Sequence, residues 1–173
     1  FGTAALLLGL RESLARGTAP AAACVSSWAM LSPLPRPKAI AACLAMDEDK
    51  ALAIVGSDPR IGESWPAYAT SKSAVSRLVR RLAPTAAWAG AGIVLNAVAP
   101  TATRTPMIAR HLSTEEGTKA LLSLVPSPSG RIAEAEDVAG MLAFLVSPAA
   151  RHVSGQIIFI DAGLEALRRG EST

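Results

Sequence analysis

Three short apolar runs alternate with helical patterns along the chain, and this alternation constrains the fold more than any other feature of the sequence. The runs are Ala21–Val25, Ile93–Val98 and Gln156–Ile160, each with Gly, Pro, Ser or Asp at or near its ends. Continuous apolar runs of this length are typical of strands that are buried on both faces of a parallel sheet. We therefore expect an α/β fold in which helices cover both faces of the sheet.

The segments between the runs carry helical periodicity or proline-rich sequence. Helices are predicted at 2–16, 39–46, 47–55, 67–88, 134–146 and 164–169. Pro84 should kink or shorten the long helix 67–88, because proline removes a backbone donor. The stretch from Trp28 to Pro66, called the insert below, is interpreted as a helical subdomain inserted into a single domain of residues 1–173. Residues 101–128 are rich in Thr, Ser and Pro, which predicts a mobile loop with one or two short helices.

Composition and net charge limit which classes of binding partner we expect. The 173 residues include 17 basic and 14 acidic side chains, and a net charge of +3 does not favour a nucleic-acid or membrane partner. No apolar run approaches the roughly 18 residues that a membrane span needs. Two cysteines, Cys24 and Cys43, fit a reducing compartment, so we expect a cytoplasmic protein. His111 and His152 lie far apart without ligand spacing, and no metal site is predicted.

A candidate proton-transfer site stands at the start of the long helix. Tyr68 is the one tyrosine of the chain, and Lys72 follows it by one helical turn, which places both side chains on one face. A phenol has a reference pKa of about 10, and a nearby ammonium favours its ionised form. Ser27 follows the first apolar run, at the strand end where ligands of parallel sheets bind. On these residues alone, a solvated Tyr–Lys pair and a serine that caps a turn are the simpler interpretations.

The wider pattern resembles the short-chain dehydrogenase/reductase family. The matching motifs, in order, are Tyr68-Ala69-Thr70-Ser71-Lys72, Asn96 with Val98 and Pro100, Thr105-Pro106-Met107, Gly130-Arg131, Glu136-Asp137-Val138-Ala139, Phe144-Leu145, Ser154-Gly155 and Asp161-Ala162-Gly163. The resemblance covers the chain outside the insert and implies a partial Rossmann-like, doubly wound parallel sheet. The family's glycine-rich fingerprint is absent and the sequence starts at Phe1 rather than Met, so we expect that the amino-terminal half of the fold is missing here.

The resemblance implies an NAD(P)-dependent oxidoreductase that interconverts a secondary alcohol and a ketone. Tyr68 would exchange a proton with the substrate oxygen, Lys72 would bind the nicotinamide ribose, and Ser27 would stabilise the substrate oxygen. The resemblance also implies cofactor contacts from Tyr68, Pro100, Thr101, Thr103 and Thr105, and substrate contacts from Trp28, Met107 and Ile108. At Thr101 and Ala162 the family usually has glycine, and a side chain at Thr101 is expected to crowd the nicotinamide loop.

The insert lengthens the spacing between Ser27 and Tyr68 beyond that usual in the family. An insertion at this point resembles the bacterial 3-alpha-hydroxysteroid dehydrogenase/carbonyl reductase subset. That resemblance implies a hydroxysteroid or another bulky apolar carbonyl compound as substrate, NAD in preference to NADP, and a homodimer. Two alternatives stay open: a non-catalytic remnant that acts as an interaction or dimerisation module, and a family member with another substrate such as a 3-oxoacyl thioester.

Overall fold

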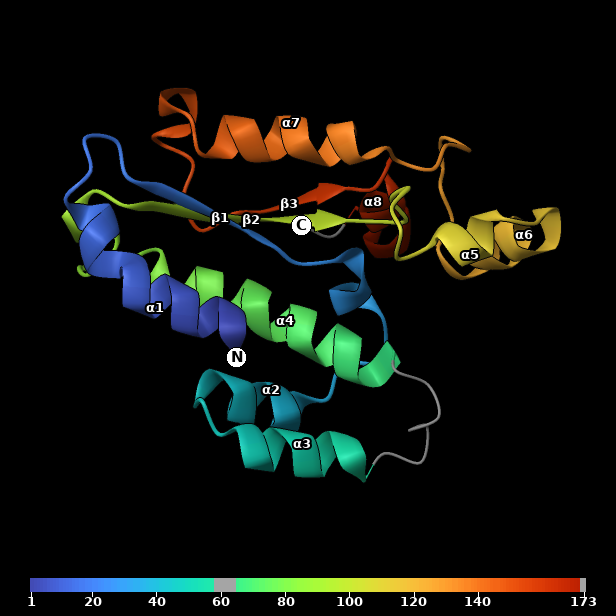
Figure 1. The fold of residues 1–173 in the computed structure, drawn as a ribbon, viewed down its shortest axis with the longest axis horizontal. Coiled ribbons are helices and arrows are strands. Elements are labelled where there is room, and N and C mark those ends of the chain that lie inside the picture. Colours follow the sequence, from blue (N-terminus) through green and yellow to red (C-terminus); the bar gives the residue numbers. More distant parts are fainter. Residues whose placement is uncertain (58–64, 172–173) are drawn as a thin grey trace.

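The computed structural model describes residues 1–57 and 65–171 and contains one parallel sheet (Figure 1). Its strands are β1 (Ala21–Val25), β2 (Val94–Pro100) and β3 (Ile157–Ile160), in the order β1-β2-β3. The central strand β2 joins both neighbours through its middle: Val98 pairs with Val25 on one side and with Ile158 on the other. The predicted α/β fold with a parallel sheet is confirmed.

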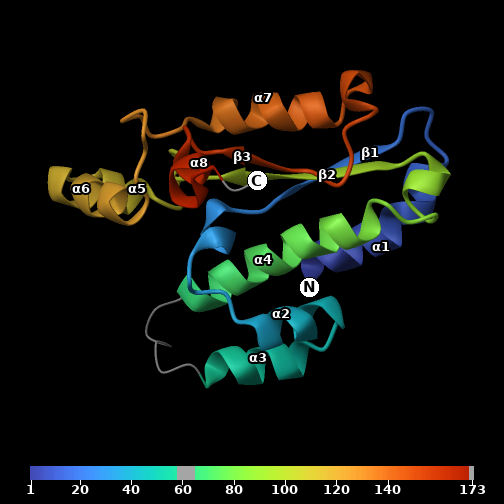
Figure 2. The ribbon, with the colours of Figure 1, turned by 180° about the vertical axis from the view of Figure 1, so that it is seen from behind.

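Helices lie on both faces of the sheet, as a doubly wound fold requires (Figures 1 and 2). α1 (Gly2–Ala15) and α4 (Trp65–Leu82) cover one face, and α7 (Ala135–Leu145) covers the other. The main core forms between the sheet and the first pair of helices. Its buried members are Leu7, Cys24, Val79, Ala83, Trp88, Ile93, Leu95 and Ala97.

The long helix ends earlier than its apolar periodicity predicts. α4 closes at Leu82, whereas the predicted helix 67–88 continued to Trp88. Pro84 explains the difference, because it disfavours helical backbone at the residue before it and donates no hydrogen bond itself. The chain then turns, and Trp88 packs into the core instead of extending the helix.

The insert contributes a helical hairpin that packs on α4. After the short η1 (Trp28–Leu31), α2 (Pro37–Leu44) packs against α4 and α3 (Glu48–Gly56) packs against α2 (Figure 1). The buried side chains of α2 and α3 are Ala39, Ile40, Ala42 and Ala51. Residues 58–64 of the insert lie outside the described residues, while Trp65 and Pro66 form the first turn of α4. The division into a domain and an inserted subdomain stays a prediction.

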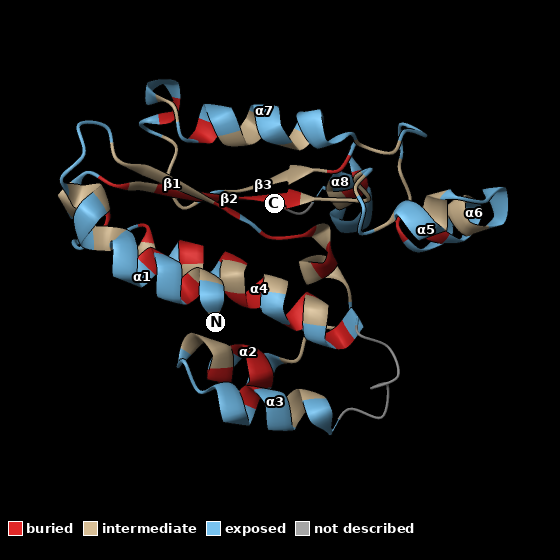
Figure 3. Cartoon of the chain, viewed as in Figure 1, coloured by how far each residue is buried: buried red, intermediate tan, exposed pale blue. Residues whose placement is uncertain are grey.

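The predicted loop 101–128 contains two short helices, α5 (Ala109–Leu112) and α6 (Glu115–Leu124), which lie beside α8 (Leu164–Arg169) in Figure 1. One apolar cluster, here called the arm cluster, packs α5 and α6 against η1 and α8. It contains Leu121, Val125 and Leu164, with Trp28, Ala102, Ile108 and Leu112 packed around them. Figure 3 shows that most of the outer surface of these helices is exposed.

The remaining short elements are η2 (Ala89–Ala91) and η3 (Pro148–Ala150). Among the described residues, none of the helices is both long and apolar enough to cross a membrane.

Ala162 has backbone strain that a glycine would relieve. Its φ is 55°, in the left-handed region, and Gly163 follows at 92°. The left-handed conformation costs a residue with a Cβ roughly 1–2 kcal/mol, which exceeds the added chain entropy of glycine. We expect Ala162→Gly to raise the free energy of unfolding by about 0.5–1 kcal/mol, measured by denaturant titration.

The matched control for this prediction is Ala166→Gly, in the helical backbone of α8. There glycine should lower the free energy of unfolding by about 1 kcal/mol. A loss of stability in Ala162→Gly as large as in this control would contradict the strain argument.

Candidate functional site

The carboxyl end of β1 meets α4 through side-chain and backbone hydrogen bonds. Lys72 Nζ donates to the carbonyl oxygen of Val25 at 3.0 Å. The next residue, Ser26, donates its backbone N–H to Val98 of β2 at 2.7 Å. The candidate lysine therefore lies at the carboxyl edge of the sheet, which is the edge where parallel sheets bind ligands.

Tyr68 and Lys72 lie on the same face of α4, as their spacing predicts. The Lys72 ammonium is 5.6 Å from the centroid of the Tyr68 ring. The Trp65 and Tyr68 rings meet edge-to-face at a centroid distance of 6.0 Å. The Tyr68 ring thus contacts both an aromatic ring and a cation, and both Tyr68 and Lys72 are half-buried.

Burial perturbs the ionisation of Lys72. Loss of water around the ammonium lowers the pKa of Lys72, and the nearby Cys24 thiol partly offsets this by raising it. Burial also raises the pKa of the Cys24 thiol, while the Lys72 charge lowers it. The lysine therefore releases its proton more readily than an exposed lysine does.

Ser27 is buried and acts as the N-cap of η1. Its Oγ accepts a hydrogen bond from the Ala29 backbone N–H at 3.2 Å. This contact is the capping role that the simpler sequence interpretation predicts. It uses a lone pair of the oxygen and leaves the hydroxyl hydrogen for a substrate oxygen, so the two roles are compatible.

The end of β2 and the loop after it contain Pro100, Thr101, Thr103 and Thr105, which are expected to contact the cofactor. Thr101 donates its backbone N–H to Ile160 of β3 at 3.1 Å, and the Thr103 hydroxyl donates to the Thr101 carbonyl at 3.0 Å. Pro100 is the last residue of β2, and Thr105 is half-buried beyond it. Thr101 adopts an ordinary negative φ, so threonine fits the backbone conformation here. Its Oγ1 is buried and has no hydrogen-bond partner among the described residues.

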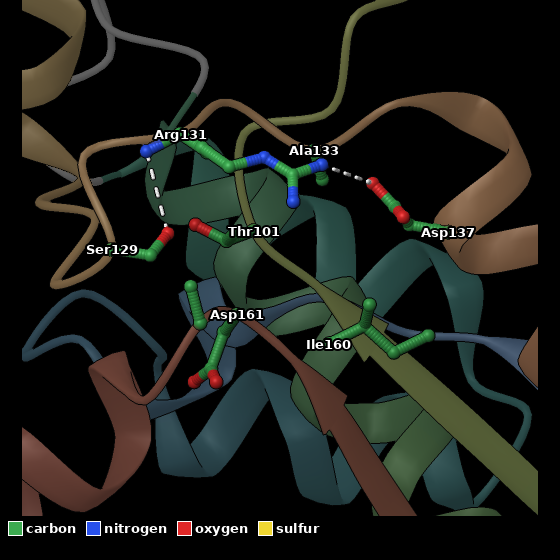
Figure 4. A pocket seen from close by; sticks show the side chains of 8 residues that line it. Thr101, Ser129, Arg131, Ala133, Asp137, Ile160 and Asp161 are labelled. Carbon is green, nitrogen blue, oxygen red and sulfur yellow. Dashed lines mark hydrogen bonds and ion pairs between the residues drawn. The ribbon is translucent and has the colours of Figure 1, made fainter.

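An open cavity of about 310 Å³ lies beside this loop (Figure 4). It is lined by Thr101, Ser129, Arg131, Ala133, Asp137, Ile160, Asp161 and Ala162. Figure 4 shows Arg131 extended toward Asp137, with a nitrogen–oxygen distance of 3.9 Å. The sequence predicts no site role for Ser129 or Arg131, and the Gly130-Arg131 motif is the signal that points to this position.

The residues expected to contact the substrate divide into two groups. Trp28 and Ile108 both pack in the arm cluster, so the structure brings them together across a long stretch of sequence. Met107 is 77% exposed and lies outside this cluster. All three side chains are apolar, and their contact with a substrate stays a prediction.

Asn96 and Asp161 fix the backbone at the two ends of β3 through side-chain hydrogen bonds. Asn96 Nδ2 donates to the Val153 carbonyl at 2.6 Å, and its Oδ1 accepts from the Gln156 N–H at 3.0 Å. The Asp161 carboxylate accepts the N–H groups of Gly163 at 3.1 Å and Glu165 at 2.6 Å. The prediction that Asp161 orders the turn after the last strand is confirmed.

Comparisons with known proteins agree with this geometry. A family profile described as enoyl-(acyl carrier protein) reductase matches residues 37–165. The chain is 39% identical over 170 residues to the 3-alpha-hydroxysteroid dehydrogenase/carbonyl reductase of Comamonas testosteroni, a match that covers 98% of this chain and 65% of that protein. The chain thus spans slightly less than two thirds of this relative's length.

Two solved structures show the same fold. The 3-alpha-hydroxysteroid dehydrogenase of Pseudomonas sp. B-0831, complexed with NADH, is 38% identical with a TM-score of 0.85, and the match covers 100% of this chain and 66% of that one. A protein assigned as a 2-deoxy-D-gluconate 3-dehydrogenase from Agrobacterium tumefaciens, with bound NADP, is 26% identical with a TM-score of 0.64, and the match covers 96% and 53%. On the family profile, the sequence identity and the shared fold, this chain belongs to the short-chain dehydrogenase/reductase family.

Proposed function

We propose that this chain carries the proton-transfer site of an NAD(P)-dependent oxidoreductase that interconverts a secondary alcohol and a ketone. The observation that carries the proposal is the placement of Tyr68 and Lys72 together, with Lys72 Nζ bound to the Val25 carbonyl at the carboxyl edge of the sheet. A phenol can act as a general acid or base towards a substrate oxygen, and a nearby positive charge favours the phenolate over the phenol.

The residues present fit the nicotinamide end of a dinucleotide. Thr101 Oγ1 is a buried hydroxyl oxygen without a partner among residues 1–57 and 65–171, and a ligand could satisfy it. Lys72 has three N–H donors, and the Val25 carbonyl takes one of them, which leaves donors for ribose hydroxyls. Pro100, Thr103 and Thr105 would line the same loop. When bound, the dinucleotide would accept or supply the hydride.

NAD(H) is the cofactor that we propose first, because the Pseudomonas relative is complexed with NADH. The Agrobacterium relative binds NADP, which makes NADP the alternative. The sequence contains no glycine-rich turn between a strand and a helix, so the proposal concerns the nicotinamide end of the cofactor only.

Tyr68, Ser27 and Lys72 would each have a separate role in the proton transfer. The Tyr68 hydroxyl would give its proton to the ketone oxygen in reduction and take it back in oxidation. The Ser27 hydroxyl would donate a hydrogen bond to the same oxygen and stabilise the charge that develops there. The Lys72 ammonium would stabilise the phenolate of Tyr68 between the two directions.

A hydroxysteroid or another bulky apolar carbonyl compound is the proposed substrate. The names of the Comamonas and Pseudomonas relatives support this class, and Trp28 and Ile108 supply an apolar surface that suits it. An acyl thioester is the second candidate, because the matching family profile is described by an acyl-carrier-protein reductase. The homodimer stays a prediction.

Lys72→Met tests the proposed cofactor site. The variant removes the donor to the ribose, and a hydrogen bond to a charged group contributes about 1.5–3 kcal/mol, so the Kd for NAD(H) should rise roughly ten- to hundredfold. The measurement is calorimetric binding of NADH and NADPH to the protein as its gene encodes it, alongside turnover of a 3-hydroxysteroid.

The matched control is Lys119→Met, which removes an exposed lysine of α6 that pairs with Glu115 at 2.7 Å. Cofactor affinity should be unchanged in this control. Equal affinity in wild type and Lys72→Met would contradict the cofactor site, and wild-type protein that turns over neither substrate class would favour the non-catalytic remnant.

A further inference from the structure

Two buried serine hydroxyls join the end of β1 to α4 beside Lys72. Ser26 is 2% exposed and Ser76, one turn after Lys72, is 1% exposed. Their Oγ atoms are 2.7 Å apart, and Ser26 Oγ is also 2.9 Å from the backbone carbonyl oxygen of Lys72. The sulfur of Met30 lies 3.0 Å from Ser76 Oγ and is the third side chain in this network.

The direction of these hydrogen bonds follows from counting hydrogens. Each serine has one O–H, and the Lys72 carbonyl can only accept. If Ser26 donates to the Lys72 carbonyl, Ser76 can donate to Ser26, and both hydrogens then reach oxygen acceptors. The thioether of Met30 is a weaker acceptor and receives no hydrogen in this arrangement. The chain of donors therefore runs from Ser76 to Ser26 to the Lys72 backbone.

A second hydrogen bond holds Lys72 from its other end. The Lys72 ammonium donates to the carbonyl of Val25, the residue just before Ser26. The backbone of Lys72 thus accepts from Ser26 while its side chain donates to Val25. Ser26 thus holds the backbone carbonyl of Lys72, and Val25 holds its side-chain ammonium. The position of the ammonium therefore depends on both hydrogen bonds.

We propose that Ser26 is a positioning residue which, supported by Ser76, holds Lys72 against the end of β1 so that its ammonium stays beside Tyr68. Side chains of consecutive extended residues point to opposite sides. Ser26 accordingly bonds to α4, while its neighbour Ser27 caps η1. The role of Ser26 for the reaction rests on the proposed function, but its effect on Lys72 can be measured without turnover.

The test is the titration of Lys72 by NMR of lysines labelled at Cε. The chain has four lysines, and the Lys72 signal is identified by its loss in Lys72→Arg. The titratable groups that face Lys72 are the Cys24 thiol on β1 and the Tyr68 phenol on α4. In Ser26→Ala the lysine should move toward water, so the pKa of Lys72 should rise toward its ordinary value.

Ser76→Ala is the second variant, for the case that Ser26→Ala does not fold. It removes the donor to Ser26 but leaves the bond from Ser26 to Lys72, so the pKa of Lys72 should rise by less. Ser73→Ala is the matched control: Ser73 is a buried serine of α4 outside the network, and its removal should leave the titration unchanged.

In the protein as its gene encodes it, Ser26→Ala should lower kcat about five- to tenfold with little change in substrate KM, the size expected for one lost hydrogen bond. An unchanged Lys72 titration in both Ser26→Ala and Ser76→Ala would overturn the positioning role. This failure is distinct from failure of the proposed function, since turnover that survives Tyr68→Phe would refute the function whatever the lysine titration shows.

Discussion

Tyr68→Phe should lower turnover by two to four orders of magnitude in the protein as its gene encodes it, because it removes the group that exchanges a proton with the substrate oxygen. The substitution deletes a single oxygen and keeps the aromatic ring. The ring contacts with Trp65 at 6.0 Å and with the Lys72 ammonium at 5.6 Å should therefore survive. Cofactor affinity should change little, since the proposed ribose contacts come from Lys72.

Steady-state kinetics and calorimetric cofactor binding measure the two halves of this prediction. The matched control is Ser71→Ala, which removes an exposed hydroxyl that donates to the Tyr68 backbone carbonyl at 2.8 Å. It should leave turnover near that of the wild type. Turnover by Tyr68→Phe at the rate of this control would exclude Tyr68 as the acid and base.

Asn96→Ala should lower the free energy of unfolding by about 2–5 kcal/mol. Asn96 is 0% exposed in the middle of β2, and its amide bonds to both the Val153 carbonyl and the Gln156 N–H. Alanine satisfies neither backbone group, and each unsatisfied buried group costs about 1–3 kcal/mol. A loss of this size is a large share of the roughly 5–15 kcal/mol that stabilises a typical domain.

Chemical denaturation at equilibrium measures this loss as a lower midpoint with an unchanged slope. Gln156→Ala is the control, because its exposed side chain bonds only to the neighbouring Ser154 carbonyl among the described contacts. This control should change the free energy of unfolding by no more than about 0.5 kcal/mol. Equal midpoints for Asn96→Ala and Gln156→Ala would show that the buried amide does not tie β2 to the start of β3.

The elements that the sequence predicts well are those with local signals. The run Ala21–Val25 and the helix Leu164–Arg169 have the predicted boundaries, because residues such as Pro20 and Gly163 mark their ends in the sequence itself. The pairing of Tyr68 with Lys72 is equally local, since one helical turn separates them. The long helix ends at Leu82, which confirms the predicted shortening by Pro84, although the apolar periodicity continues to Trp88.

The roles that the sequence does not reveal depend on contacts between distant segments. Ser26 reads in the sequence only as a strand terminator, because its partners lie on α4 at Lys72 and Ser76. Met107 matches a family motif, yet its exposed side chain shows that a motif fixes the residue type and not its surroundings. Hydrogen bonds of this kind need the folded chain to bring their partners together.

The pairing of the strands has a consequence for how the chain folds during synthesis. Ala21 pairs with Val94, and Ala97 pairs with Ile157, so β1 and β2 must each pair with a strand that is made much later. Helices such as α4 can form from neighbouring residues, whereas non-local strand pairing is slow. During synthesis, β1 therefore has no strand partner until β2 has emerged, and β2 has an unpaired edge until β3 follows. Unpaired strand edges of this kind favour aggregation of the nascent chain.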